Sequence, residues 1–222
     1  MHTTVKKLNS VQDKIKEILN KRQLKTKPEI IAVTKTFSFE KIVPLLDFGH
    51  LHFGENRIQE AENKWFDLKE KYKNIQLHMI GGLQSNKAKL AVKLFDYIHS
   101  LDSEKLALKI SQYEKELNKK TKLFIQVNLA SEAQKSGVSS KDLNLFFEHC
   151  VNDLSLNVIG LMCLPPINSD SDSYFKILKK KSEELNLNHL SMGMSGDYEQ
   201  AILNGSTYLR LGTVIFGERN SN

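Results

Sequence analysis

Eight short apolar runs alternate with amphipathic, charge-rich segments along the 222 residues, and this alternation limits the folds open to the chain. The apolar runs lie at about 30–34, 51–54, 75–80, 97–101, 123–128, 158–164, 189–194 and 208–216. The segments of helical length lie at 5–22, 38–48, 57–73, 84–95, 103–119, 140–151, 171–186 and 196–204. Alternating strands and helices predict parallel strands joined by crossover helices.

The number of these units separates two parallel-sheet folds. Eight strand–helix units in 222 residues favour an α/β fold of the compact (β/α)8 TIM-barrel type. A doubly wound open sheet is the alternative, but it usually has a glycine-rich fingerprint after its first strand, where this chain has TKTFSFE. Because little follows the last run, we expect the N-terminal helix at 5–22 to cover the gap left by an eighth outer helix. The prediction is one barrel domain, residues 1–222, with an extra N-terminal helix.

Composition narrows the class of protein further. Hydrophobic residues make up 40% of the chain and charged residues 26%, which is ordinary for a soluble globular protein. The net charge of +6 suggests nucleic-acid binding, but lysines alternate with glutamates as on solvated helix faces. The N-terminal segment has no signal-peptide or membrane pattern, and Cys150 and Cys163 have no disulfide or zinc spacing. We therefore expect a cytoplasmic monomer with neither nucleic acid nor membrane as partner.

Polar and small residues gather where the apolar runs end, which is where barrels of this type hold their active groups. The first run ends at Lys35, and the second is followed by Glu55 and Asn56. The loops after the last two runs contain Gly193, Ser195, Gly196, Gly212 and Thr213. Barrels often bind phosphate in these two loops, because small residues let backbone N–H groups approach an anion. Their position favours a phosphate site over ordinary loop chemistry.

Lys35 gains a chemical meaning from its place across the barrel mouth from this predicted phosphate site. Desolvation at an apolar strand end can lower the pKa of an amine and make it a nucleophile toward aldehydes. A lysine nucleophile combined with a separate phosphate loop is the recognition pattern for pyridoxal 5′-phosphate, PLP. Arg210 is placed near the ring nitrogen of such a cofactor, with pairing to a carboxylate at the barrel rim as the alternative.

Longer motifs in a fixed order support the same ligand. They are AVTKT (32–36), FGEN (53–56), HMIGGLQSNK (78–87), IQVN (125–128), KSG (135–137), GLMCLP (160–165), LSMGMSGD (190–197) and GSTYLRLGTVIFG (205–217). With these motifs the chain resembles the YggS/PROSC group, the pyridoxal phosphate homeostasis proteins, from about residue 30 to residue 217. The resemblance implies a fold-type III PLP barrel that holds the cofactor as a Schiff base on Lys35.

The resemblance also implies the other contacts of the cofactor. They are Ser195, Gly212 and Thr213 at the phosphate, Arg210 toward the pyridine nitrogen, Asn56 beside the ring, and His78 farther out as a wall of the pocket. One departure concerns the loop after the third strand. Where the family usually has Gly-Pro-Leu-Gln, this chain has Gly-Gly-Leu-Gln at 81–84, so we expect this loop to be more flexible.

The same barrel type occurs in catalysts, so carrier and enzyme have to be distinguished. Alanine racemases and certain decarboxylases complete their active site with a second, β-rich domain that supplies a tyrosine acid/base opposite the lysine. This chain ends with the barrel, and Arg210 disfavours protonation of the ring nitrogen, so we expect poor catalysis. The favoured function is PLP homeostasis without catalytic residues, by buffering the cofactor or delivering it to PLP-dependent apoenzymes. A racemase or decarboxylase is the alternative.

A metal-dependent barrel hydrolase is a further alternative. His50, His52, Glu55 and His78 are residue types that bind metals. His50 and His52 lie at the start of their strand, toward the face that serves stability, whereas Glu55 lies at its other end. We therefore predict no metal site.

Overall fold

The structure, a computed structural model, describes residues 1–130 and 136–218, so Lys135 of the KSG motif lies outside the described ranges. The strands are β1 (Glu29–Val33), β2 (His52–Glu55), β3 (Gln76–Met79), β4 (Tyr97–Leu101), β5 (Lys122–Asn128), β6 (Val138–Ser139), β7 (Val158–Met162), β8 (His189–Met194) and β9 (Tyr208–Leu211). The α-helices are α1 (Thr3–Arg22), α2 (Phe39–Asp47), α3 (Ile58–Lys71), α4 (Ala88–Leu94), α5 (Glu104–Glu116), α6 (Leu143–Glu148), α7 (Ser171–Glu184), α8 (Tyr198–Leu203) and α9 (Thr213–Phe216).

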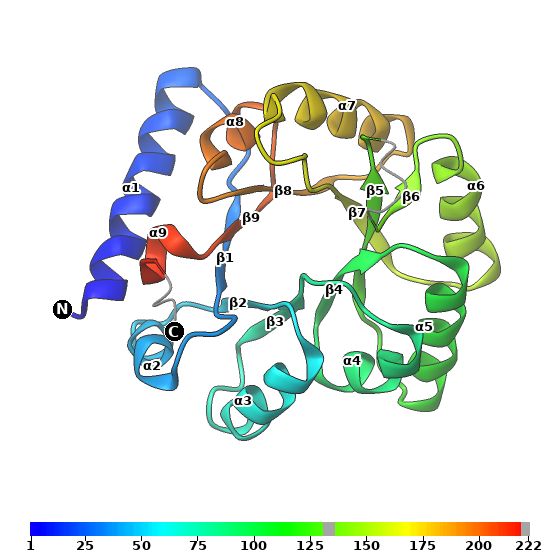
Figure 1. Ribbon diagram of the computed structural model, residues 1–222, viewed down its shortest axis with the longest axis horizontal. Coiled ribbons are helices and arrows are strands. Elements are labelled where there is room, and N and C mark those ends of the chain that lie inside the picture. The colour runs from blue at the N-terminus through cyan, green and yellow to red at the C-terminus, as the bar shows by residue number, and fades with distance from the viewer. Residues whose placement is uncertain (131–135, 219–222) are drawn as a thin grey trace.

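Within these described ranges, eight parallel strands close into a barrel in the order β1-β2-β3-β4-β5-β7-β8-β9, with helices around the outside (Figure 1). The ring closes where β9 pairs with β1, Arg210 opposite Ile31. The two-residue strand β6 pairs with the end of β5 beside this ring. The predicted (β/α)8 barrel is confirmed.

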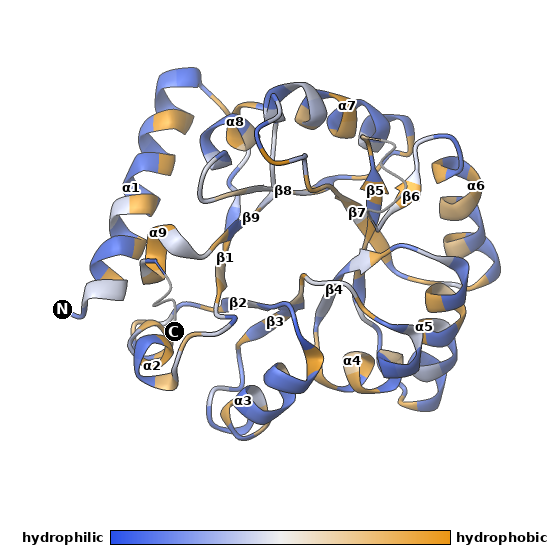
Figure 2. Ribbon diagram, viewed as in Figure 1, coloured by the Kyte–Doolittle hydropathy of each residue, from blue (hydrophilic) through white to orange (hydrophobic). Residues whose placement is uncertain are grey.

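Both faces of the barrel strands are covered, which explains their nearly continuous apolar sequence. An inner cluster fills the barrel with one large side chain from each of five strands: Ile31, Tyr97, Phe124, Met162 and Tyr208. The main core lies between the strands and the helices. Figure 2 shows apolar residues along the strands and on the inner sides of the helices.

Helix α1 takes the place of an outer helix after the last strand. It buries Val5, Leu8, Val11 and Ile15, spaced three or four residues apart, which gives the helix one apolar side. This side packs against α9 and also contacts α8 and α2 (Figure 1). The prediction that the N-terminal helix covers this gap is confirmed.

The last apolar run differs from its prediction as a strand over 208–216. Strand β9 ends at Leu211, and the single-turn helix α9 follows from Thr213. The amides of Phe216 and Gly217 donate to the carbonyls four residues earlier, at 2.9 and 2.8 Å, so the same apolar sequence turns into a helix. In the described ranges, none of the helices is long and apolar enough to cross a membrane.

Candidate functional site

A cavity of about 800 Å³ opens at the C-terminal ends of the barrel strands. Its walls contain six of the residues predicted to bind a cofactor: Lys35, Asn56, Ser195, Arg210, Gly212 and Thr213. These residues come from four separate parts of the chain, and the fold brings them to one mouth of the barrel. A cavity of this size accommodates a small organic molecule such as a cofactor.

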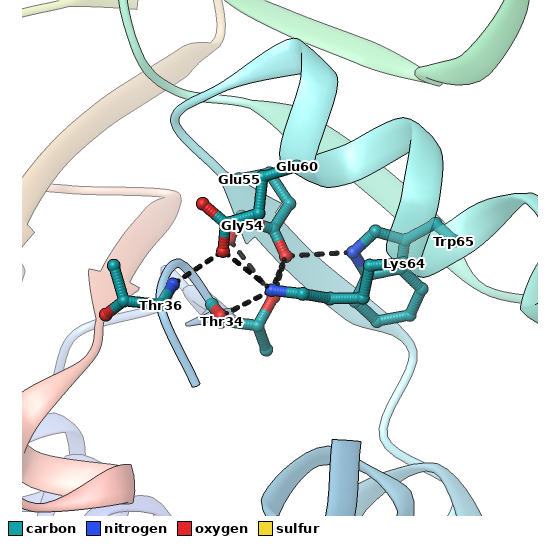
Figure 3. Close-up of polar contacts among 7 residues, drawn as sticks. All are labelled: Thr34, Thr36, Gly54, Glu55, Glu60, Lys64 and Trp65. Carbon is teal, nitrogen blue, oxygen red and sulfur yellow. Dashed lines mark hydrogen bonds and ion pairs between the residues drawn. The ribbon is translucent and has the colours of Figure 1, made fainter. Parts of the chain in front are cut away.

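The carboxylate of Glu55 is the centre of a buried polar cluster next to this cavity (Figure 3). Its Oε1 accepts hydrogen bonds from Thr34 Oγ1 at 2.6 Å, Lys64 Nζ at 2.8 Å and Trp65 Nε1 at 2.9 Å. The side chain of Glu55 is 0% exposed and that of Lys64 is 12% exposed. A buried carboxylate is tolerated when it is paired and hydrogen-bonded. The cluster therefore ties the end of β1 to β2 and α3.

The same cluster holds the backbone on both sides of Lys35 (Figure 3). Lys64 Nζ donates to the carbonyl oxygen of Thr34 at 2.8 Å, and the amide of Thr36 donates to Glu60 Oε1 at 2.6 Å. Thr36 has a φ of 64°, a left-handed conformation that costs a β-branched residue about 1–3 kcal/mol. The contacts to Glu60 and Lys64 hold this strained turn, so Lys35 projects from a fixed backbone.

The loops after β8 and β9 meet at Ser195. Its Oγ accepts hydrogen bonds from the amides of Gly212 and Val214, both at 3.3 Å. The amide of Met194 donates to Asp197 Oδ1 at 2.6 Å, which closes the turn that carries Ser195. A hydroxyl group and converging backbone N–H groups are the donors that bind phosphate in proteins.

Asn56 lies at the cavity wall with an unpaired acceptor. Its Oδ1 is buried and has no hydrogen-bond partner among the residues that the structure describes. Gly81 packs so closely against Asn56 that a Cβ there would lie 2.2 Å from the Asn56 carbonyl oxygen. A Cβ at Gly82 would meet no atom within 4 Å. The greater flexibility expected for this loop stays a prediction.

Arg210 lies at the inner end of the cavity and is only 4% exposed. Its Nη1 donates to Ser191 Oγ at 2.6 Å and its Nη2 to the carbonyl oxygen of Cys163 at 2.9 Å. Burial lowers the pKa of Arg210 from its ordinary value. Within the described part of the chain no carboxylate lies within 4.0 Å of the guanidinium, so the alternative of a carboxylate pair at the rim is wrong.

Two residues singled out in the sequence lie away from this cavity. His78 is fully buried inside the barrel and hydrogen-bonds to His52 and His99, so its prediction as a pocket wall is wrong. Gly193, in one of the predicted phosphate loops, has a φ of 93° and packs against α8, where a Cβ would come within 2.5 Å of Ala201 Cβ. Gly193 is therefore explained by packing and backbone conformation.

Sequence reasoning missed further wall residues. Tyr174, at the start of α7, and Gln126, in β5, both line the cavity. Gln126 Nε2 donates to the carbonyl oxygen of Ser136 at 3.0 Å. The polar Gln126 within an apolar strand was a usable signal. Tyr174 gave none, because only the fold brings α7 to the barrel mouth.

The residues that suggested a metal site are spread over the barrel. His52 begins β2 and Glu55 ends it, as predicted. In the described ranges, no group of three or more histidine, cysteine or carboxylate side chains is arranged to hold a metal ion. The Nδ1 of His52 and the Nε2 of His78 hydrogen-bond to each other at 2.9 Å. The hydrolase alternative therefore lacks a coordination sphere in the described ranges.

The family described as "Alanine racemase, N-terminal domain" matches residues 7–220. The closed barrel therefore belongs to the class of alanine racemase N-terminal-type barrels. An alanine racemase from Clostridium difficile has the same fold, with a TM-score of 0.67 and 16% identity. That match covers 95% of this chain but 58% of the racemase chain.

Relatives of higher identity define the family more narrowly. The "Pyridoxal phosphate homeostasis protein" of Synechocystis sp. is 39% identical over 199 residues, covering 86% of this chain and 91% of the relative. Its counterpart in Vibrio cholerae is 37% identical and covers 86% of each chain. PipY of Synechococcus elongatus, in a structure with PLP bound, is 33% identical, has a TM-score of 0.80 and covers 91% of this chain and 100% of PipY. The chain belongs to the family of pyridoxal phosphate homeostasis proteins.

Proposed function

We propose that this chain binds PLP and serves PLP homeostasis by holding the cofactor as a Schiff base on Lys35 and buffering or delivering it. One observation carries the proposal. Lys35, which projects from a fixed backbone, lines the same cavity as the hydrogen-bond donors around Ser195. PLP supplies an aldehyde that an amine captures reversibly. The relatives' name and the PLP-bound structure of PipY support the same ligand.

The residues of the cavity fit the parts of PLP. In this proposal Ser195, Gly212 and Thr213 hold the phosphate with hydroxyl and backbone N–H donors. The guanidinium of Arg210 faces the ring nitrogen, and Asn56, whose Oδ1 is unpaired, lies beside the ring. Residues 1–222 then act as one PLP-binding barrel domain.

We propose that the protein is a carrier and has no catalytic residues. A buried guanidinium beside the ring nitrogen disfavours protonation of that nitrogen, which weakens the electron sink that racemases and decarboxylases use. Tyr174 is a tyrosine in the cavity wall, so its hydroxyl is the group to test as an acid/base of the racemase kind. We expect PLP-loaded protein to racemise or decarboxylate amino acids no faster than free PLP. Turnover that Tyr174→Phe abolishes would overturn the carrier proposal.

The cellular setting completes the proposal. We propose a cytoplasmic monomer that passes PLP to PLP-dependent apoenzymes. Burial raises the pKa values of Cys150 and Cys163 to about 12, so both are unreactive thiols suited to a reducing compartment. Sedimentation will give the oligomeric state. Transfer is measured as the activation of an apoenzyme by loaded protein at a rate above that given by free PLP at the same concentration.

The decisive experiment is an absorption spectrum with added PLP, before and after borohydride reduction. We expect a band near about 420 nm in the wild type and reductive trapping of the cofactor on Lys35. Lys35→Ala should lose both, whereas Lys41→Ala, a substitution of the half-buried lysine in the following helix, should keep both. If the wild type gives no band with excess PLP, the proposed function is wrong.

A further inference from the structure

A line of hydrogen-bonded side chains runs through the inside of the barrel from Arg210. Arg210 Nη1 is 2.6 Å from Ser191 Oγ, which is 2.7 Å from His99 Nδ1. His99 Nε2 is 2.9 Å from His78 Nδ1, and His78 Nε2 is 2.9 Å from His52 Nδ1. Arg210 comes from β9. The other four residues, Ser191, His99, His78 and His52, come from β8, β4, β3 and β2, and we call these four the histidine chain.

The inner members of the histidine chain are fixed by packing. Ser191, His78 and His99 are 0% exposed. The ring of His78 stacks on Tyr97, with centroids 4.1 Å apart, and that of His99 stacks on Phe124, with centroids 4.3 Å apart. Stacking inside a close-packed barrel restricts rotation of these rings. The hydrogen-bond geometry is therefore a lasting feature of the fold.

The far end of the histidine chain reaches the opposite face of the barrel. The side chain of His52 is 15% exposed, and its Nε2 lies 3.7 Å from Glu29 Oε2. Both residues line a second cavity of about 860 Å³, at the N-terminal ends of β1 and β2. Together with Arg210, the histidine chain thus spans the barrel from the predicted cofactor cavity to a cavity on its other face.

Arg210 sets the direction of the hydrogen bonds. A guanidinium has only donors, so Ser191 Oγ accepts from it. Among the described residues His99 Nδ1 is the other hydrogen-bond partner of Ser191 Oγ, so the serine donates its own proton to His99 Nδ1. A neutral imidazole that accepts at Nδ1 carries its proton on Nε2. His99 therefore donates from Nε2 to His78 Nδ1, and His78 donates in the same way to His52.

The far end fits this direction. With its proton on Nε2, His52 turns an N–H toward the carboxylate of Glu29. In the reverse direction a bare nitrogen of a neutral His52 would face that carboxylate, and the buried hydroxyl proton of Ser191 would have no acceptor among the described residues. Burial is the main cause that lowers the pKa of His52, and it holds the pKa values of His78 and His99 well below the ordinary range. Neutral rings are what this direction requires.

We propose that Ser191, His99, His78 and His52 are positioning residues that act through Arg210 and hold its guanidinium at the ring end of the cavity. Because every hydrogen bond points the same way, each polarises the next and strengthens the acceptor that Ser191 offers to Arg210. The buried positive charge is thereby held by a neutral partner and stays available to a ligand. The role toward the cofactor rests on the proposed function, whereas the direction of the histidine chain does not.

The direction is tested on protein without added cofactor. In protein labelled with ¹⁵N-histidine, two-bond ¹H–¹⁵N correlation spectra distinguish the two neutral tautomers from the protonated ring. We expect His52, His78 and His99 to be neutral and protonated at Nε2 at pH 7. A proton on Nδ1 of His78 or His99, or a charged ring at either position, would overturn the proposal whether or not the protein binds PLP.

The positioning role is tested by variants loaded with PLP. Ser191→Ala and His78→Phe interrupt the histidine chain, and we expect about tenfold weaker PLP binding and a shifted absorption band, because a hydrogen bond to a charged group is lost or weakened. His78→Gln keeps a donor and an acceptor and should restore much of the affinity. His189→Phe makes the same substitution at a histidine outside the histidine chain and should leave band and affinity unchanged.

Each outcome of these measurements decides one question. Folded Ser191→Ala and His78→Phe proteins with the wild-type band and affinity would refute the positioning role. If circular dichroism shows that either variant does not fold, two measurements still test the proposal. They are the histidine tautomers of the wild type and the PLP affinity and absorption band of the His78→Gln protein. A wild type that binds no PLP refutes the proposed function, and the tautomer spectra then judge the direction of the histidine chain alone.

Discussion

Lys35 and Arg210, two cationic side chains of the cavity, are held by networks of opposite chemistry. The cluster around Glu55 is ionic and fixes Lys35 indirectly, through the backbone of Thr34 and Thr36 (Figure 3). The histidine chain is neutral and contacts the guanidinium of Arg210 directly. The difference teaches that a barrel can fix one cationic side chain by holding its backbone, and can fix another by giving its charged group neutral acceptors.

The largest expected effect comes from breaking the ionic network. Glu55→Gln removes one of the two carboxylates that pair with the mostly buried Lys64. Breaking a buried ion pair typically costs about 3–5 kcal/mol, and we expect about 3 kcal/mol because Glu60 still pairs with Lys64. We expect this loss in the free energy of unfolding, measured with urea. Glu60→Gln, at a more exposed carboxylate of the same cluster, is the control and should cost less. Equal stability of Glu55→Gln and wild type would contradict the assignment.

Acid should act on the other network. His52, His78 and His99 have lowered pKa values in the folded protein, so below about pH 6.5 the unfolded chain binds more protons and stability falls as the pH falls. Between pH 7 and pH 5.5 we expect the free energy of unfolding to drop by about 2–3 kcal/mol from His78 and His99, whose pKa values are well below the ordinary range. The His78→Gln protein should lose about 1 kcal/mol less. An unchanged drop in this variant would show that other groups cause it.

A hydroxyl occurs in each network, and deleting it gives a matched pair. Ser191→Ala takes the acceptor from a buried guanidinium, and we expect a loss of about 2 kcal/mol in the free energy of unfolding. Thr34→Val keeps the side-chain shape and leaves Glu55 with Lys64 and Trp65, so its cost should be about 1 kcal/mol. Parallel urea titrations measure both. If Thr34→Val cost more than Ser191→Ala, the hydroxyl of the neutral network would contribute less to the free energy of unfolding than that of the ionic one.

The smallest expected effect concerns the loop that follows β3. Gly82→Ala adds a methyl group into open space and restricts the unfolded chain, which should stabilise the protein by about 0.4–1 kcal/mol. Gly81→Ala is the contrasting variant, because its Cβ would collide with the backbone of Asn56. Thermal unfolding of both proteins measures the difference. Stabilisation by Gly81→Ala would contradict the packing described for Asn56.

Much of this molecule follows from local sequence patterns. The alternation of strand and helix patterns predicted the barrel, and the positions of strand ends predicted the six residues that meet at the cavity. The histidine chain was not predictable in this way. The register of neighbouring strands decides which imidazoles hydrogen-bond to each other; His78, for example, lies opposite Tyr97. That register is set by closure of the whole barrel.

The ionic cluster lies between these two cases. Glu60 and Lys64 are four residues apart on α3, a spacing that by itself indicates a helical ion pair. The contact of Lys64 with Glu55 and with the carbonyl oxygen of Thr34 depends on how α3 folds back over β1 and β2. Local spacing thus indicates no more than an ion pair on one helix, and the fold makes this pair part of the support of Lys35.

The position of α9 has a consequence for the distant N-terminal helix. This single turn begins at Thr213, in the cavity wall, and its other side packs against α1. A ligand that orders Thr213 would also restrain α9, and through it the surface on which α1 rests. Slower amide hydrogen exchange in α1 would then indicate that a ligand is bound at the barrel mouth. The exchange rate in α1 would thus measure how much of the protein has an occupied cavity.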